Sequence, residues 1–169
     1  MELTKMIGLM GDSHDNLPLI RKAVSLFNQR KVDHVLHTGD IISPFAVKEL
    51  AKLACPFIVT FGNNDGERLQ LKETITSSGG QLIWPRVVCN CEGHKIALLH
   101  GEDREVVAAL AKSGEFSIVA CGHWHEPMIS KTGHSTLVVN PGETCGYLTG
   151  RATVAIADMG RMEASLFDL

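Results

Sequence analysis

The chain has 169 residues, of which 44% are hydrophobic and 21% are charged, and its net charge is −3 when the histidines are neutral. This length fits one domain that buries roughly 70% of its unfolded surface, and the composition is too apolar for a disordered protein. Its longest basic runs are pairs such as Arg21-Lys22, so no lysine or arginine stripe predicts binding to duplex nucleic acid.

The first half of the chain alternates predicted strands and helices. Strands are expected over residues 5–10, 32–37 and 56–61, with a helix after each. Asn16 and Ser43 are the expected N-caps of the first two helices, each followed by a proline in the first turn. The third helix is expected over about residues 67–76. This βαβαβα order predicts a parallel sheet.

Apolar residues at helical spacing define the faces that the first two helices should bury. In the first helix they are Leu17, Ile20, Val24 and Phe27, and in the second they are Phe45, Val47, Leu50 and Leu53.

Strands in the second half are shorter and pair locally. Three hairpins are predicted, over residues 86–92 and 95–100, 128–131 and 136–140, and 152–158 and 162–167. A helix is expected over 102–112 and a buried strand over 116–121, while His134 is expected in a turn. This mixture predicts an α/β fold of two packed sheets with helices outside. No linker or repeat divides it, so residues 1–169 form one domain.

Targeting and redox features are sparse. The apolar run at residues 6–10 is too short for a signal-peptide core, and no later segment approaches the length of a membrane span. We therefore expect a cytoplasmic protein with no membrane contact. The five cysteines are odd in number and form no C-x-x-C, which favours reduced, mostly buried thiols over disulfides or a thiolate zinc site.

Five predicted strands end in side chains that can bind metals. The donors are Asp12 and His14, Asp40, Asn63, His100, and His123 and His125. Loops that leave the carboxyl ends of strands converge on one edge of an α/β sheet, so donors from distant segments can meet. Each short motif alone also fits ordinary turn chemistry, but five strand ends with donors of one class would be improbable as turns. Together they predict a site for two divalent metals.

The donor types restrict which metals suit this site. Four histidines and one amide among seven donors favour manganese, iron, cobalt, nickel or zinc over magnesium, which prefers an all-oxygen shell. The sequence does not select one of these five.

These motifs resemble the calcineurin-like metallophosphoesterases across nearly the whole chain. The resemblance rests on D-x-H at Asp12, G-D at Gly39, the G-N-x-D motif at Gly62, His100, and G-H-x-H at Gly122. The late stretches at residues 140–143 and 145–150 are similar to the small single-domain phosphodiesterases of bacteria and archaea. The resemblance implies a four-layer αββα sandwich.

The resemblance also implies a dinuclear centre. Asp12, His14 and His125 would bind one metal, Asn63, His100 and His123 the other, and Asp40 would bridge them. A metal-bound hydroxide would attack a small phosphodiester in line.

Two positions depart from the family pattern. Asn64 replaces a histidine that is thought to protonate the leaving group or hold the phosphate, and an amide can donate a hydrogen bond but cannot deliver a proton. Glu102 follows His100-Gly101 where many relatives have histidine. It is expected either near the substrate or as a carboxylate at a helix amino terminus. The G-D-x-V-D-R-G continuation of protein phosphatases is missing, which disfavours phosphoprotein substrates.

Three further residues lie near the predicted site. Two of them have both a structural and a functional interpretation, and the third has a structural role. His37 is expected to be a core histidine or to orient Asp40, and Trp124 to pack or to form a wall of the site. Gly142 is expected in a tight turn beside the site.

The sequence therefore predicts a metal-dependent phosphodiesterase and leaves alternatives open. A phosphomonoesterase or nucleotidase could use the same site, although Asn64 disfavours it. A non-catalytic scaffold is the other alternative, because a retromer subunit with this fold acts through protein contacts. Oligomeric state stays open, and a homo-oligomer is allowed.

Overall fold

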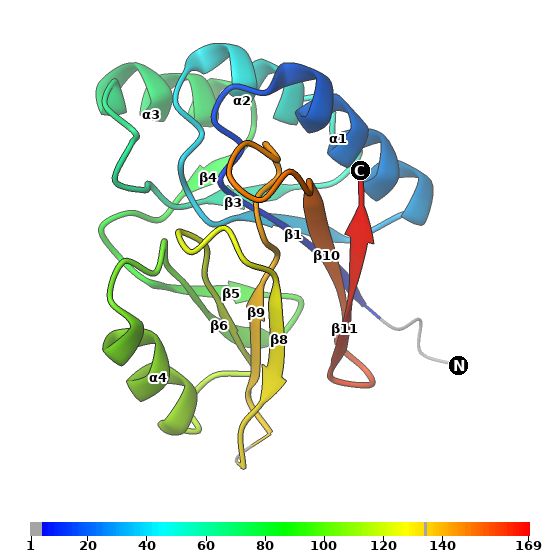
Figure 1. The fold of residues 1–169 in the computed structure, drawn as a ribbon, viewed down its shortest axis with the longest axis vertical. Helices are drawn as coiled ribbons and strands as arrows, with labels where there is room; N and C mark the ends of the chain where they lie inside the picture. The colour runs from blue at the N-terminus through cyan, green and yellow to red at the C-terminus, as the bar shows by residue number, and fades with distance from the viewer. Residues whose placement is uncertain (1–4, 134) are drawn as a thin grey trace.

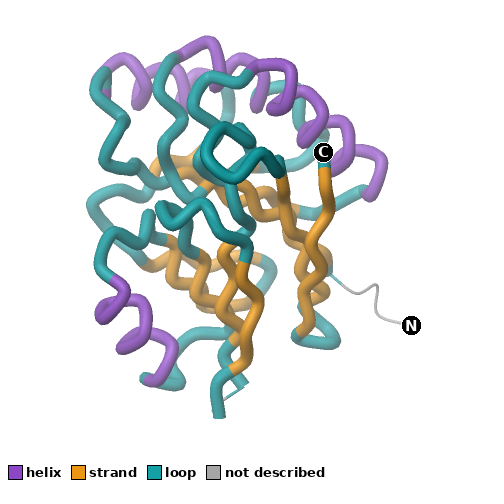
Figure 2. The backbone as a smooth tube through the Cα atoms, viewed as in Figure 1, coloured by secondary structure: helices purple, strands orange, loops and turns teal. Residues whose placement is uncertain are grey.

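Two mixed β-sheets lie face to face between two layers of helices in the computed structural model (Figures 1 and 2). The structure describes residues 5–133 and 135–169, which contain four helices and eleven strands. His134 lies outside the described residues. Three helices cover one side of the molecule and α4 covers the other, so the predicted two-sheet α/β fold is confirmed.

The first sheet contains the predicted parallel half. Its strand order is β11-β10-β1-β2-β3-β4, and β1 to β4 are parallel. The strands are β1 (Met6–Met10), β2 (His34–His37), β3 (Phe57–Val59), β4 (Gln81–Leu82), β10 (Thr153–Asp158) and β11 (Glu163–Asp168). The short β4 was not predicted. Strands β10 and β11 form the predicted antiparallel hairpin. In addition, β10 lies antiparallel beside β1.

The second sheet has the order β5-β6-β7-β9-β8. Its strands are β5 (Val88–Cys91), β6 (His94–Leu98), β7 (Ile118–Ala120), β8 (Met128–Lys131) and β9 (Leu137–Asn140). The predicted hairpins β5–β6 and β8–β9 are antiparallel, whereas β6, β7 and β9 are parallel.

The helices begin at capping residues. They are α1 (Leu17–Arg30), α2 (Pro44–Leu50), α3 (Arg68–Ser77) and α4 (Arg104–Lys112). The side chains of Asn16 and Ser43 accept hydrogen bonds from main-chain N–H groups of α1 and α2, as predicted. At α4 the cap is Asp103, which accepts from Glu105 and Val106. Glu102 lies one residue before this cap, so α4 begins two residues later than predicted, with Glu102 just outside its amino terminus.

Three apolar clusters separate the four layers. One lies between the first sheet and α1 to α3, one between the two sheets, and one between the second sheet and α4. Strand β1 serves two of them, since Ile7 and Leu9 face the second sheet while Met10 faces the helices. Phe45 was predicted on the buried face of α2 but is 65% exposed, because the helix buries the face of Ala46, Val47 and Leu50.

The described residues include no helix that is both long enough and apolar enough to cross a membrane. All five cysteines are free thiols, and four of them are buried.

Candidate metal centre

The seven predicted donors lie together, although they come from five loops and both sheets. Each donor atom is within 3.6 Å of a donor atom of another member. They follow β1, β2 and β3, which are parallel neighbours in the first sheet, and β6 and β7, which are parallel neighbours in the second. Asp12, Asp40 and His100 are buried, whereas Asn63 is exposed, so the cluster opens to solvent beside Asn63.

The donors form two groups that meet at one carboxylate. In the first group, His125 Nε2 lies 3.6 Å from Asp12 Oδ1, and the His14 and His125 rings are 5.4 Å apart. In the second group, Asn63 Oδ1 lies 3.0 Å from His100 Nε2 and 2.9 Å from His123 Nδ1. Oδ2 of Asp40 lies 3.4 Å from both His14 Nε2 and His100 Nε2. Asp40 therefore touches both groups.

The imidazole of His100 directs its lone pair at oxygen atoms. Its Nδ1 lies 2.8 Å from the carbonyl oxygen of Thr38, which only accepts, so Nδ1 carries the hydrogen. Nε2 then faces the oxygens of Asn63 and Asp40. Burial opposes charge on His100, but the hydrogen bond to Asp40 and the carboxylates of Asp40 and Asp12 raise its pKa to about 9. A cation, either a proton or a metal, is needed between these groups.

His125 is held in the same way by Glu143, which sequence reasoning did not place in the site. Its Nδ1 lies 2.6 Å from Oε2 of the fully buried Glu143. Burial opposes the charge of Glu143, but hydrogen bonds from His125, Thr149 and Leu148 outweigh it and lower its pKa to about 2. A carboxylate behind a histidine fixes the tautomer and directs Nε2 toward a metal. The only sequence clue was an acidic residue in the motif at residues 140–143.

Orphaned polar atoms test whether the cluster fits metals. Asp12 Oδ1 and His14 Nε2 are buried and have no hydrogen-bond partner among the described residues. Burial also raises the pKa of Asp12 to about 6, against the opposing effect of His100 and His125. Buried polar atoms without partners are costly. The cluster therefore fits divalent ions, which nitrogen and oxygen donors of this kind bind.

The backbone at the cluster is unusually strained. Five of the seven donor residues have positive φ: Asp12, His14, Asp40, His123 and His125. Non-glycine residues rarely adopt this conformation, and such strain gathers at functional sites. Close approach adds a second constraint, because a Cβ at Gly62 would lie 2.2 Å from Asp40 Oδ1. These loops are shaped for donor placement at a cost in local stability.

Asp65 fixes the loop that carries Asp40. This buried carboxylate accepts hydrogen bonds from the main-chain N–H groups of Gly62, Asp40, Ile41 and Ile42, at 2.8–2.9 Å. Sequence analysis placed Asp65 in a motif but gave it no role. It joins the loop after β2 to the loop after β3, and so sets Asp40 beside Asn63.

Comparison with known proteins agrees with this geometry. The family model described as the calcineurin-like phosphoesterase superfamily domain matches residues 6–162.

The chain belongs to this superfamily.

A protein of Methanocaldococcus jannaschii named phosphodiesterase is 41% identical over 158 residues, which cover 93% of this chain and 95% of that protein. The solved structure of an archaeal phosphodiesterase has a TM-score of 0.90 and 39% identity, covering 97% of this chain and 99% of the other. Vacuolar protein sorting 29 of Cryptosporidium parvum covers 99% of this chain and 98% of its own, with a TM-score of 0.68 at 18% identity, which shows a shared fold alone. The expected four-layer superfamily fold is confirmed.

Asn64, where many superfamily members have histidine, lies exposed at the mouth of the cluster. Its main-chain N–H donates to Asp40 Oδ1 at 2.8 Å, and its side-chain amide donates to Asp40 Oδ2 at 2.7 Å. Asn64 thus orients Asp40. Glu102 is also exposed and lies on the rim of a hollow lined by His100.

His37 and Trp124 have structural partners. His37 is buried, accepts from Gly39 N–H and pairs with Ser13 Oγ at 3.0 Å, and burial lowers its pKa to about 3. It is a core histidine that holds the loops and does not contact the carboxylate of Asp40. Trp124 donates from Nε1 to the carbonyl oxygen of Gly101 and packs against the apolar cluster between the second sheet and α4. Gly142 adopts φ +80° in its turn, as predicted.

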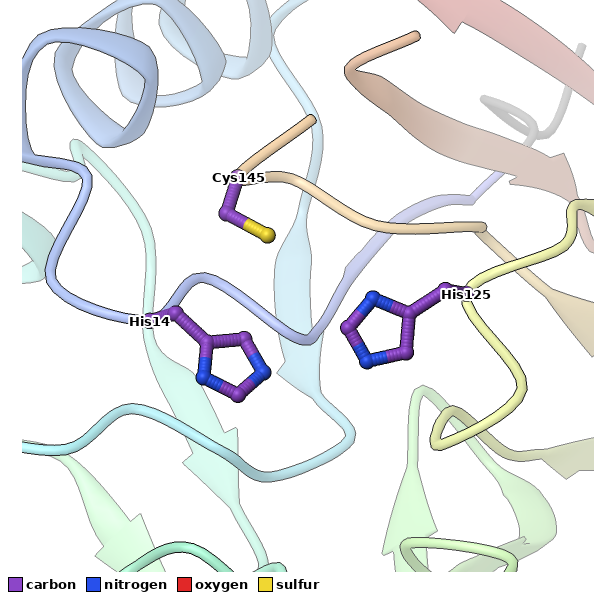
Figure 3. A group of neighbouring side chains, drawn as sticks. All are labelled: His14, His125 and Cys145. Carbon is purple, nitrogen blue, oxygen red and sulfur yellow. The ribbon is translucent and has the colours of Figure 1, made fainter. Parts of the chain in front are cut away.

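Cys145 lies beside two of the predicted donors, His14 and His125. Figure 3 shows its sulfur turned toward the space between the rings of His14 and His125. The thiol donates to Glu143 Oε2 at 3.4 Å, and burial raises its pKa to about 12. Sequence analysis did not place Cys145 among the donors, yet its sulfur and a nitrogen of each of the two imidazoles lie within 4.8 Å of one another.

Proposed function

We propose that this protein is a divalent-metal-dependent phosphodiesterase with a dinuclear centre. Asp12, His14 and His125 would bind one ion and Asn63, His100 and His123 the other, while Asp40 would bridge them. The observation that carries the proposal is the position of Asp40 Oδ2, 3.4 Å from a histidine nitrogen of each group.

The spacing of the donor atoms supports this assignment. Donors about 2.1 Å from one tetrahedral or octahedral ion lie about 3.0–3.4 Å apart. Contacts within the second group run from 2.9 to 3.3 Å, and those of Asp40 fall at the upper end of that range. Manganese, nickel, cobalt, iron or zinc would suit these donors.

Two such ions would polarise the phosphoryl group and lower the pKa of an attacking water molecule. The chain's own contribution is placement. Asp12 and Asp40 neutralise only part of the charge of two dications, which leaves the site attractive to a phosphodiester anion. Asn64 holds Asp40 in place, and Glu143 and Thr38 keep the lone pairs of His125 and His100 pointing inward.

A phosphodiester substrate is favoured over a monoester by Asn64. A monoester with a basic alcohol benefits most from a proton donor, and Asn64 cannot supply one. The names of the Methanocaldococcus relative and of the structural neighbour, both called phosphodiesterases, support the same choice.

Chelation tests this proposal. Removing metal should abolish hydrolysis of bis(4-nitrophenyl) phosphate, and adding manganese, nickel or cobalt should restore it. The same panel should include an aryl monoester, since faster monoester cleavage would favour the phosphomonoesterase. A metal-loaded protein inert toward every ester would instead support the scaffold.

A further inference from the structure

A hollow of about 230 Å³ lies directly beside the metal cluster. His100 belongs to both, since it lines the hollow and contacts Asp40 and Asn63 in the cluster. The other principal lining residues come from the end of β3, the segment before β5 and the start of α4: Phe61, Trp84, Pro85, Arg86, Glu102 and Val106. A group bound here would adjoin a phosphate at the cluster.

Two large apolar side chains form exposed walls of this hollow. Trp84 is 44% exposed and Val106 is 46% exposed. Exposed tryptophan is uncommon, because its large apolar ring is normally covered. Both side chains face one hollow, and that hollow touches a predicted metal ligand, so a ligand can account for their exposure.

The Trp84 ring is braced on the protein side. Its ring centre lies 5.8 Å from that of Phe61, and the guanidinium of Arg68 lies 4.7 Å from the Trp84 ring. Arg68 is itself fixed, because it donates to the carbonyl oxygens of Asp65 and Gly62 at 2.9 and 3.1 Å. The loop that carries Asn63 thus holds the indole, and a preorganised ring loses little entropy when a ligand stacks on it.

Size and charge define what fits. Pockets that enclose whole drug-sized ligands measure about 300–1,000 Å³, so this hollow suits one ring and not a whole molecule. Arg86 offers donors, and Glu102 offers acceptors, at the rim. These groups match the edge of a heteroaromatic ring, while the apolar walls match its faces.

We infer that this hollow is the subsite for a planar aromatic group esterified to the scissile phosphate, with Trp84 as its stacking partner. The link to the scissile phosphate rests on the proposed phosphodiesterase function. A nucleobase and a simple aryl ring share the required chemistry. Trp84 and Val106 determine specificity in this account and take no part in bond breaking.

Binding can be measured without hydrolysis. The chain has two tryptophans, so the protein supplied with diamagnetic Zn²⁺ should give two indole N–H signals in a ¹H–¹⁵N spectrum, and Trp84→Phe assigns them. Titration with adenosine or with phenol, neither of which contains phosphate, should shift the Trp84 signal. Val106→Phe should fill the hollow and suppress that shift. A larger shift with adenosine identifies a nucleobase site, and a larger shift with phenol identifies an aryl site.

Kinetics supply the second arm. Trp84→Ala should raise KM for the preferred aromatic diester by roughly tenfold, the size of a lost stacking contact, whereas the inhibition constant of dimethyl phosphate, added as a non-aromatic competitor, and the metal content should stay unchanged. Trp84→Phe should recover most of the loss. Phe45→Ala is the matched control, because Phe45 is exposed and does not line the hollow.

Two failures remain distinguishable. If neither probe moves the Trp84 signal while diesters are hydrolysed, the subsite is wrong and the phosphodiesterase stands. If a probe moves the Trp84 signal but no ester is cleaved, the hollow binds aromatic rings and the proposed function is wrong. Equal loss of affinity for the aromatic diester and for the competitor dimethyl phosphate in Trp84→Ala would also overturn the subsite.

Discussion

The two sheets contribute different chemistry to the metal cluster. Loops of the first sheet supply all three oxygen donors, Asp12, Asp40 and Asn63, together with His14, whereas loops of the second sheet supply only imidazoles, those of His100, His123 and His125. Oxygen donors are held mainly by N–H groups, since Asp40 accepts from Asn64 and Asp12 accepts from the main chain of His123. The imidazoles of His100 and His125 are held by acceptors.

The supporting contacts also cross between the sheets. Thr38 of the first sheet's loops holds His100 of the second, and His123 of the second holds Asp12 of the first. Four donors are therefore each oriented by a partner of opposite polarity, and for Asp12 and His100 that partner comes from the other sheet. Neither sheet alone can therefore assemble the site. Substitutions that affect the oxygen donors and substitutions that affect the imidazole donors should also have different consequences.

Loss of the shared carboxylate should have the largest effect. Asp40→Ala should remove most of both metals. Loss of one electrostatic contact to a transition state typically lowers activity by about 10²–10³-fold, and the loss in Asp40→Ala should be larger. His123→Ala, which changes only the imidazole side, should remove one metal at most. Elemental analysis of both variants checks this, and a content near two per chain in Asp40→Ala would remove Asp40 from the bridge.

Support on the oxygen side should appear as stability. Asp65→Asn replaces one of the two buried oxygens that together accept four main-chain hydrogen bonds with an NH₂ group and should lower the free energy of unfolding by about 2–3 kcal/mol, or Tm by about 4–12 °C. Asp168→Asn alters an exposed ion pair with Arg151 and should leave Tm nearly unchanged. Equal Tm values for the two variants would show that Asp65 does not clamp the loop.

Support on the imidazole side should appear as metal affinity. Glu143→Gln should weaken metal binding or activity by about 10–100-fold, as loss of partners behind metal ligands commonly does. Glu126→Gln is the matched control, since Glu126 is an exposed neighbour of His125. Metal titration of both variants decides the point, and indistinguishable affinities would deny Glu143 its orienting role.

Asn64 should give the smallest effect on activated substrates. With no imidazole to protonate the departing oxygen, the rate should fall steeply as the leaving alcohol becomes more basic. Asn64→His should flatten that dependence, because general acid catalysis is worth about 10²–10⁴-fold on poor leaving groups. A plot of log rate against leaving-group pKa checks this. A shallow wild-type slope with chemistry rate-limiting would mean that another group supplies the proton.

The sequence predicted the donors better than their supports. The clustering of the seven predicted donors could be foreseen because each follows an apolar strand, and parallel strands bring their carboxyl ends together. Asp65 and Glu143 were missed because their roles depend on main-chain and side-chain groups brought together by folding. No local pattern states which N–H groups a buried carboxylate will meet.

The errors in the fold have local causes. Phe45 satisfies helical spacing, yet spacing could not show that α2 buries the face of Ala46, Val47 and Leu50 instead. The helix near residue 102 was started too early because Glu102 and Asp103 both suit a helix amino terminus, and only the hydrogen bonds of Asp103 decide between them. The two-residue strand β4 is too short to show an alternating pattern of apolar and polar residues.

The central claim is that two ions shared through Asp40 catalyse phosphodiester hydrolysis. The most direct test is a stepwise titration of metal-free protein with manganese or nickel, in which bound metal and hydrolysis of bis(4-nitrophenyl) phosphate are measured on the same samples. The account predicts that activity rises with the second equivalent and is maximal at two ions per chain. Full activity at one ion per chain, or no hydrolysis with two ions bound, would contradict it.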